Sequence, residues 1–347
     1  MKINKIEKFE KIFNKFTSIK KIHESILFIE NTSGDFSYSK GYGGKELDSP
    51  LLMASITKLF TTTCILVLQE QGKLSLDDKI TKYFNNSILR GLHVYGGKEY
   101  SFDLTLSDLM FQTSGLPDIF EEGKASTKNK IVKKDFYITF EETIECIKKV
   151  KPHFAPRTKK KAYYSDINFD MLGKIVEKVN GTTLMEAYEQ FIFFPLGLKK
   201  TYLIENGDNV VPNIYYKNTA LKRPKYLSCC GSSGGGVTTA SEMMIFMKAF
   251  FGGKLFNKAI FSKLSIYRKL QFLMGPIRYG GGYMQVPLSG VVTLFSGEGE
   301  LIGHTGSTGS FAFYYPQKDL FFVGDLNQMA GPSLPIRISM QLAMAAK

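Results

Sequence analysis

The chain has 347 residues, of which 44% are hydrophobic and 22% are charged. This composition provides for one large core, or for one core with an inserted lobe, and it excludes a largely disordered chain. The net charge of +13 is concentrated between residues 124 and 161, where twelve Lys and Arg stand against four Asp and Glu. We expect a solvated surface there. An anionic polymer or an anionic substrate is the alternative, and no nucleic-acid motif accompanies the stretch.

The first elements along the chain are a helix and a hairpin. Residues 1–21 scatter lysines among spaced apolar residues, which predicts an amphipathic helix. We expect it to pack on the protein's own sheet, and a position on a membrane surface is the alternative. Residues 25–30 and 36–42, joined by turn residues, predict a β-hairpin. Residues 59–68 are almost entirely apolar, which predicts a buried helix closed by Gly72.

The middle of the chain is predicted to be mostly helical. Thr105 and Asp108 have the spacing of a capping box at the start of one helix, and Thr183 and Glu186 repeat that spacing. Between them, a helix with one apolar face ends at Asn180, which a glycine follows.

The last part of the chain is rich in predicted strands. It begins after the glycine-rich residues 231–236 and a helix over residues 242–251, and a helix over residues 336–346 closes the chain. The predicted strands cover residues 282–288, 291–295, 301–305, 310–315 and 320–325.

Strands at both ends of the chain with helices between them predict an α/β fold. The α/β domain is discontinuous and consists of residues 1–78 and 226–347. Residues 79–225 form a mostly helical lobe inserted into it.

One serine stands out as a candidate nucleophile. A serine needs a base within hydrogen-bond reach, and S-x-x-K at the start of a helix supplies one on the same helical face. The chain contains three copies of this motif, which begin at Ser18, Ser37 and Ser55. Ser18 lies near the end of the first helix and Ser37 lies in a predicted strand. Only Ser55, with Lys58, comes directly before a buried helix, where free N–H groups are also available.

The sequence around Ser55 resembles the class C β-lactamase and DD-peptidase superfamily, and other motifs follow in the order of that family. The resemblance spans roughly residues 25–345. It implies the fold of these enzymes, an antiparallel sheet flanked by helices, with the active site in a cleft between the sheet and an inserted mostly helical lobe. The matching segments are Ser55-Ile56-Thr57-Lys58, residues 72–78, residues 106–117, Tyr164-Ser165-Asp166, residues 194–198, residues 234–239 and Gly303-His304-Thr305-Gly306.

The resemblance implies catalytic roles for three residues. Ser55 would be the nucleophile, Lys58 would hold a proton-relay position beside it, and Tyr164 would be the partner base. A cationic Lys58 would lower the pKa of Tyr164 and make its phenolate available. Arg157 and Lys160 fall where related sequences often carry glycine, which predicts an unusual loop before Tyr164.

Other matched positions are implied to bind substrate. The N–H of Ser307, with that of the nucleophile, would form an oxyanion hole, and the strand with Thr305 and Gly306 would bind an extended, peptide-like substrate. His304 stands where β-lactamases carry lysine, and it is expected to face the substrate, as in the DD-peptidase, D-aminopeptidase and esterase branches. Asp166 replaces the usual Asn and would pair with the lysine, since an ionised carboxylate only accepts hydrogen bonds. Both changes argue against strong β-lactamase activity.

These residues predict a serine hydrolase that forms an acyl-enzyme with a peptide-like amide, such as a D-alanyl or penicillin-type substrate, or with an ester. One alternative is an esterase with little peptidase or β-lactamase activity. An alternative of another class is a catalytically weak penicillin-fold protein that binds or assembles.

We expect no cofactor, no metal, no nucleic-acid partner and no membrane span, and we expect the four cysteines to be reduced. No signal peptide is visible, which predicts a cytoplasmic protein unless a leader has been removed.

Overall fold

A single antiparallel sheet forms the centre of the computed structural model, which describes residues 2–123, 126–205, 210–290 and 297–346. Its eight strands lie in the order β10-β11-β12-β13-β14-β15-β1-β2. The two ends of the chain meet in it, because β1 pairs with β15 and Ile26 lies opposite Asp325. The strands are β1 (Ser25–Glu30), β2 (Ser37–Tyr42), β10 (Arg268–Lys269), β11 (Arg278–Tyr279), β12 (Met284–Pro287), β13 (Glu300–Thr305), β14 (Ser310–Tyr315) and β15 (Leu320–Asp325).

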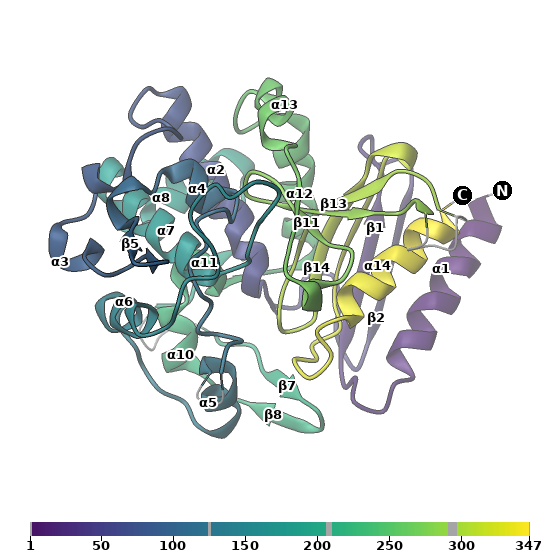
Figure 1. Cartoon of the computed structure of the whole chain (residues 1–347). Coiled ribbons are helices and arrows are strands. Elements are labelled where there is room, and N and C mark those ends of the chain that lie inside the picture. Colours follow the sequence, from purple (N-terminus) through teal and green to yellow (C-terminus); the bar gives the residue numbers. More distant parts are fainter. Residues whose placement is uncertain (1, 124–125, 206–209, 291–296, 347) are drawn as a thin grey trace.

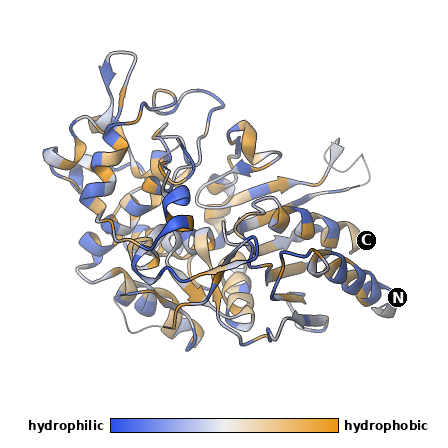
Figure 2. Ribbon diagram, turned by 90° about the horizontal axis from the view of Figure 1, so that it is seen from below, coloured by the Kyte–Doolittle hydropathy of each residue, from blue (hydrophilic) through white to orange (hydrophobic). Residues whose placement is uncertain are grey.

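Helices cover both faces of the sheet (Figure 1). On one face lie α1 (Lys2–Thr17) and α14 (Leu334–Ala345), side by side, and on the other lies α12 (Ala240–Gly252). Figure 2 shows hydrophobic residues along the strands and a mixed pattern on the outer helices, as expected when each helix buries only one side.

The side chains of strand β15 contact the helices on both faces of the sheet. Successive side chains of a strand point to opposite faces. Phe322 therefore meets Phe9 of α1, with 6.4 Å between ring centroids. Its neighbour Phe321 stacks on Tyr314, which in turn contacts Phe251 at the end of α12. All six residues of β15 are consequently buried.

The helical lobe is attached to the sheet through α2 (Thr57–Glu70), which is buried along most of its length. It packs against α7 (Asp166–Asn180), and one continuous cluster of buried hydrophobic residues runs through lobe and sheet. The other elements of the described ranges are β3 (Leu51–Leu52), α3 (Asn86–Leu89), β4 (Val94–Tyr95), β5 (Lys98–Glu99), α4 (Leu106–Met110), α5 (Thr127–Lys133), α6 (Phe140–Lys148), α8 (Leu184–Tyr188), α9 (Phe194–Leu196), β6 (Tyr202–Leu203), β7 (Ile214–Tyr216), β8 (Thr219–Leu221), α10 (Pro224–Cys229), α11 (Gly231–Gly234), β9 (Gly236–Thr238) and α13 (Phe261–Leu264).

The predicted fold class, an α/β fold with an antiparallel sheet flanked by helices, is confirmed, and so are most predicted elements. The N-terminal helix buries Phe9, Phe13 and Phe16 within the protein's own core. Capping boxes form at Thr105 and Thr183. The four cysteines are free thiols. The domain boundaries at residues 78 and 225 stay a prediction.

The structure departs from the predicted elements in the glycine-rich segment and at the sheet edge. Residues 231–234 form a helical turn and Gly236 begins β9, which joins β3 and β6 in a small sheet that the sequence pattern did not indicate. The short strands β10 and β11 were also missed, because two residues carry too little periodicity. The strand predicted over residues 291–295 lies outside the described residues. No helix in the described ranges is both long and apolar enough to cross a membrane.

Candidate active site

Ser55 lies in a tight turn that leads directly into α2. The turn (Ala54–Ile56) is a 3₁₀ helix, and Ala54 adopts φ 45°, a left-handed conformation that costs a residue other than glycine about 1–3 kcal/mol. Neighbours on both sides hold Met53 in place. Its N–H donates to Gly236 O at 2.8 Å, and its carbonyl accepts from Ser310 Oγ at 2.9 Å. The serine is thus presented by a strained turn clamped between the small sheet and the large one.

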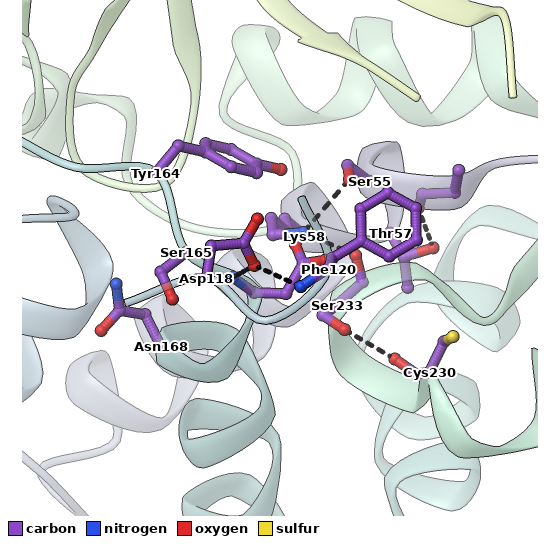
Figure 3. A network of polar contacts seen from close by, with 12 residues as sticks. Ser55, Thr57, Lys58, Asp118, Phe120, Tyr164, Ser165, Asn168, Cys230 and Ser233 are labelled. Atoms are coloured by element: carbon purple, nitrogen blue, oxygen red, sulfur yellow. Dashed lines mark hydrogen bonds and ion pairs between the residues drawn. The ribbon is translucent and has the colours of Figure 1, made fainter. Parts of the chain in front are cut away.

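Lys58 lies one turn further along α2 and is completely buried. Its Nζ donates to Ser55 Oγ at 3.2 Å, to Asp166 Oδ1 at 2.6 Å and to Ser233 O at 2.7 Å (Figure 3). An ammonium group has three donors, so all of them are occupied. In this arrangement Lys58 is a cation that orients the serine hydroxyl, with no lone pair free to take a proton.

Tyr164 lies before α7, and its hydroxyl points toward Ser55 (Figure 3). The hydroxyl is buried and completes no hydrogen bond among the described residues. Burial raises its pKa well above the usual value, the Asp166 carboxylate raises it further, and the nearby Ser55 hydroxyl only partly opposes this. The expectation that Lys58 leaves Tyr164 with a lowered pKa is therefore wrong. The resting site holds a neutral phenol.

The loop before Tyr164 is unusual, as the sequence predicts. Arg157 and Lys160 have φ 60° and φ 61°, in the left-handed region where glycine is favoured. The Arg157 guanidinium forms an ion pair with the buried Asp108, which fixes the loop against α4.

Two further carboxyl groups surround the lysine, and sequence reasoning missed both. Asp118 is buried, its Oδ1 accepts from the N–H of Asp166 at 3.4 Å, and burial together with the Asp166 charge raises its pKa well above the usual value. Asp170 lies one helical turn after Asp166, and burial followed by the same charge raises its pKa to about 7. The spacing of Asp166 and Asp170 could have indicated the second group. Asp118 gives no such signal, because only the fold brings it here.

The end of β13 faces the nucleophile turn across a very short distance. A Cβ on Gly306 would lie 2.5 Å from Met53 O and 2.9 Å from the Ala54 side chain, so only glycine fits. Ser307 follows, and its N–H makes no hydrogen bond to any other residue in the part of the chain described. Ser55 is in the first turn of its helix, where N–H groups lack intrahelical acceptors. The two N–H groups expected for an oxyanion hole thus come from adjoining segments.

These residues meet in a cleft of about 510 Å³. Ser55, Tyr164 and Asp166 contribute polar groups to it, and one wall is apolar. Arg337 of α14, which sequence reasoning also missed, is the one lysine or arginine among its described lining residues. None of the cations between residues 124 and 161 lines the cleft within the described ranges. Its other lining residues are Asp118, Phe120, Glu121, Gln271, Leu273, Met274, Gly275, Pro276, Ile277, Met284, Thr305, Gly306, Ser307, Pro332, Ser333, Ile336 and Met340.

His304 does not face the cleft, contrary to the expectation from the sequence. It is fully buried on β13 and does not line the cavity, and its Nδ1 lies 2.7 Å from Thr305 O. Nε2 lies 3.4 Å from the Tyr279 hydroxyl. Burial, assisted by the charge of Lys58, lowers the pKa of His304 to about 3. The imidazole is neutral near pH 7 and cannot replace the cationic lysine of a β-lactamase.

The described residues contain no group of three or more His, Cys, Asp or Glu side chains placed to hold a metal ion.

The buried histidine makes a prediction about stability. The unfolded chain takes up a proton near pH 6.5, whereas the folded state resists protonation down to about pH 3, so acid favours unfolding. The free energy of unfolding should therefore fall by about 1 kcal/mol more between pH 7.5 and 5.5 in the wild type than in His304→Gln. Urea unfolding at the two pH values measures this. The same pH dependence in both proteins would show that folding does not lower the pKa of His304.

Comparison with known proteins identifies the family. A family model described as Beta-lactamase matches residues 32–343. The D-alanyl-D-alanine-carboxypeptidase/endopeptidase AmpH of Escherichia coli (strain K12) is 28% identical over 283 residues, which cover 79% of this chain and 70% of that protein.

Two solved structures have the same fold at low identity. The D-stereospecific amidohydrolase from Streptomyces sp. superposes with a TM-score of 0.78 and 20% identity, over 94% of this chain and 95% of that one. EstCE1, described as a hydrolase with promiscuous acyltransferase activity, gives a TM-score of 0.74 and 15% identity over 99% of both chains. Because the family match runs through nearly the whole sequence and the architecture agrees, the chain belongs to the beta-lactamase family, whose members form a superfamily of serine hydrolases with the penicillin-binding proteins.

Proposed function

We propose that the protein hydrolyses a peptide-like amide or an ester through an acyl-enzyme on Ser55. The observation that carries this proposal is the hydrogen bond from the buried Lys58 to the hydroxyl of Ser55, at the floor of a cleft that Tyr164 and Ser307 also line. The strained turn at Ala54 supports it, since strain of this kind is found at functional sites. The similar structures include an amidohydrolase and a hydrolase with promiscuous acyltransferase activity, which leaves both kinds of acyl donor, amide and ester, open.

The reaction begins when Ser55 Oγ attacks the substrate carbonyl and its proton passes to Tyr164 in the phenolate form. The carbonyl oxygen becomes an oxyanion that the N–H groups of Ser55 and Ser307 stabilise. Tyr164 then protonates the leaving amine or alcohol, and the acyl group stays on Ser55 as an ester. Water attacks this ester by the same route, with Tyr164 as the base, and Ser55 is restored.

Because the resting site holds a protonated Lys58 and a neutral Tyr164, the active form must first lose a proton. The high pKa of Tyr164 places this loss above neutral pH. A protein that binds without turnover is the alternative of another class, and it would not form the acyl-enzyme at all.

The first test concerns the nucleophile. Intact-mass analysis after exposure to a fluorophosphonate should show one adduct on the wild type and none on Ser55→Ala. Ser18→Ala and Ser37→Ala are matched controls, since each also removes the serine of an S-x-x-K motif, and both should label fully. Labelling that persists in Ser55→Ala, or an unlabelled wild type, contradicts the proposal.

A second test concerns the base. We expect kcat/KM to rise with pH as Tyr164 loses its proton. Asp166 raises the pKa of Tyr164, so Asp166→Asn should move this rise to lower pH, by roughly one to two pH units for a unit charge a few ångströms away. Tyr164→Phe should lose that rise, and its kcat should fall by roughly 10²–10⁴-fold. The measurement is kcat/KM against pH for one ester. A rise that survives in Tyr164→Phe would assign the base to another group, with Lys58 the first candidate.

A third test separates amide substrates that carry a carboxylate from simple esters. Arg337 is the cation available in the cleft, so Arg337→Ala should raise KM about tenfold for a carboxylate-bearing substrate, the worth of one charge-assisted hydrogen bond. KM for the matched methyl ester should change less than about twofold on the same free-energy scale. Arg90→Ala, an exposed arginine outside the cleft, is the control. Equal responses of the two substrates would favour the esterase alternative.

A further inference from the structure

A long segment beside the cleft carries no acidic residue. Between Glu242 and Glu298 the sequence contains neither Asp nor Glu, but it contains seven Lys and Arg. This segment includes the edge hairpin of the sheet, in which β10 pairs with β11. The edge hairpin therefore lies in a wholly cationic segment, although it is not the only such segment of the sequence, since the stretch between Glu145 and Asp166 also has seven Lys and Arg and no Asp or Glu.

The hairpin has an apolar tip on a cationic base. At the tip, Phe272 is 96% exposed and Leu273 is 94% exposed, the highest values among the large hydrophobic residues described. At the base, Arg268, Lys269 and Arg278 occupy paired strand positions. Fully exposed apolar side chains of this size are unfavourable in water, and next to three cations they fit a partner that is both apolar and anionic.

The cations of the hairpin are not neutralised within the protein. In the described ranges, Arg268, Lys269 and Arg278 make no ion pair, whereas Lys248 of the same segment is paired with Glu30. The acidic residue facing the hairpin is Glu300, which is hydrogen-bonded to Gln285. The net charge at the base of the hairpin therefore stays positive.

The tip is also tied to the active site. The Gln271 side chain accepts from the N–H of Tyr164 at 2.9 Å and donates to its carbonyl at 3.4 Å. Leu273, Met274 and Ile277 line the cleft. Whatever the tip binds therefore lies next to the opening above Ser55.

We propose that the β10–β11 hairpin docks the protein on an anionic lipid bilayer. Phe272 and Leu273 enter the boundary between headgroups and acyl chains, and Arg268, Lys269 and Arg278 contact lipid phosphates, which is how apolar and basic residues divide at such a surface. A second copy of the chain is disfavoured as the partner, because a symmetric contact would bring the cations of two hairpins together. Docking would place the opening of the cleft next to substrates that are carried in the bilayer. The proposal does not depend on the chemistry at Ser55.

The experiment is co-sedimentation of the full chain with vesicles of phosphatidylcholine, with and without phosphatidylglycerol. The wild type should bind the anionic vesicles, and added salt should weaken the binding. Phe272→Ser should reduce the partition coefficient by about tenfold or more, and Lys269→Gln by about fivefold. Phe194→Ser is the matched control, since this phenylalanine is 74% exposed on α9 and should not matter. Neither Phe272 nor Lys269 lines the cleft, so hydrolysis of a water-soluble ester should be unchanged.

Three outcomes would overturn the proposal. One is equal binding, or none, to the two kinds of vesicle. Another is binding by Phe272→Ser that matches that of Phe194→Ser. The third is self-association that Phe272→Ser abolishes without any lipid binding, which would assign the hairpin to a second copy. A loss of ester hydrolysis in Ser55→Ala with intact vesicle binding would separate the two proposals.

Discussion

The ammonium of Lys58, buried without contact with water, sets the requirements for everything around Ser55. A charge in such a place is tolerated only when each of its donors has a partner, and removing one partner of a buried pair typically costs about 3–5 kcal/mol. Its bonds to Asp166 and Ser233 join three helical segments, because α2 supplies the lysine, α7 supplies Asp166 and the turn of α11 supplies the Ser233 carbonyl. These segments pack directly on one another. The same bonds that satisfy the charge therefore fix the nucleophile in relation to Tyr164.

The carboxyl groups around this cation exceed what is needed to neutralise it. Asp166 pairs with the lysine, while removal from water, and after it the nearby Asp166 carboxylate, raises the pKa values of Asp118 and Asp170. An amide at residue 166 would remove the carboxylate that pairs with Lys58, whereas the aspartate neutralises that charge and raises the pKa of the two other carboxyl groups. A substrate group that approaches Asp166 is favoured when it is neutral or cationic. A carboxylate is better received at Arg337, the one lysine or arginine among the described residues that line the cleft.

Local patterns in the sequence were sufficient for much of the fold. Capping boxes at Thr105 and Thr183, the end of α7 at Asn180 before a glycine and the strands β14 and β15 depend on neighbours in sequence, and each appears as predicted. The residues to which the resemblance gave catalytic roles, Ser55, Lys58 and Tyr164, also lie close together in the structure. What it could not give was the burial of His304, because a strand pattern does not say which face the helical lobe covers. The pKa of Tyr164 and the positions of Asp118 and Arg337 likewise depend on contacts between segments far apart in the chain.

The pairing of β1 with β15 has a consequence for the order in which the molecule is assembled. Residues near positions 26 and 325 must meet before the sheet is complete, and such long-range contacts form slowly. During synthesis β1, which is almost entirely buried in the finished fold, is exposed along one edge until the last strands leave the ribosome. Ser310, which holds the turn before Ser55, also arrives with those last strands. A chain interrupted before β14 would thus lack both the cover of its first strand and the clamp on its nucleophile, so this architecture makes incomplete chains inactive and prone to aggregate.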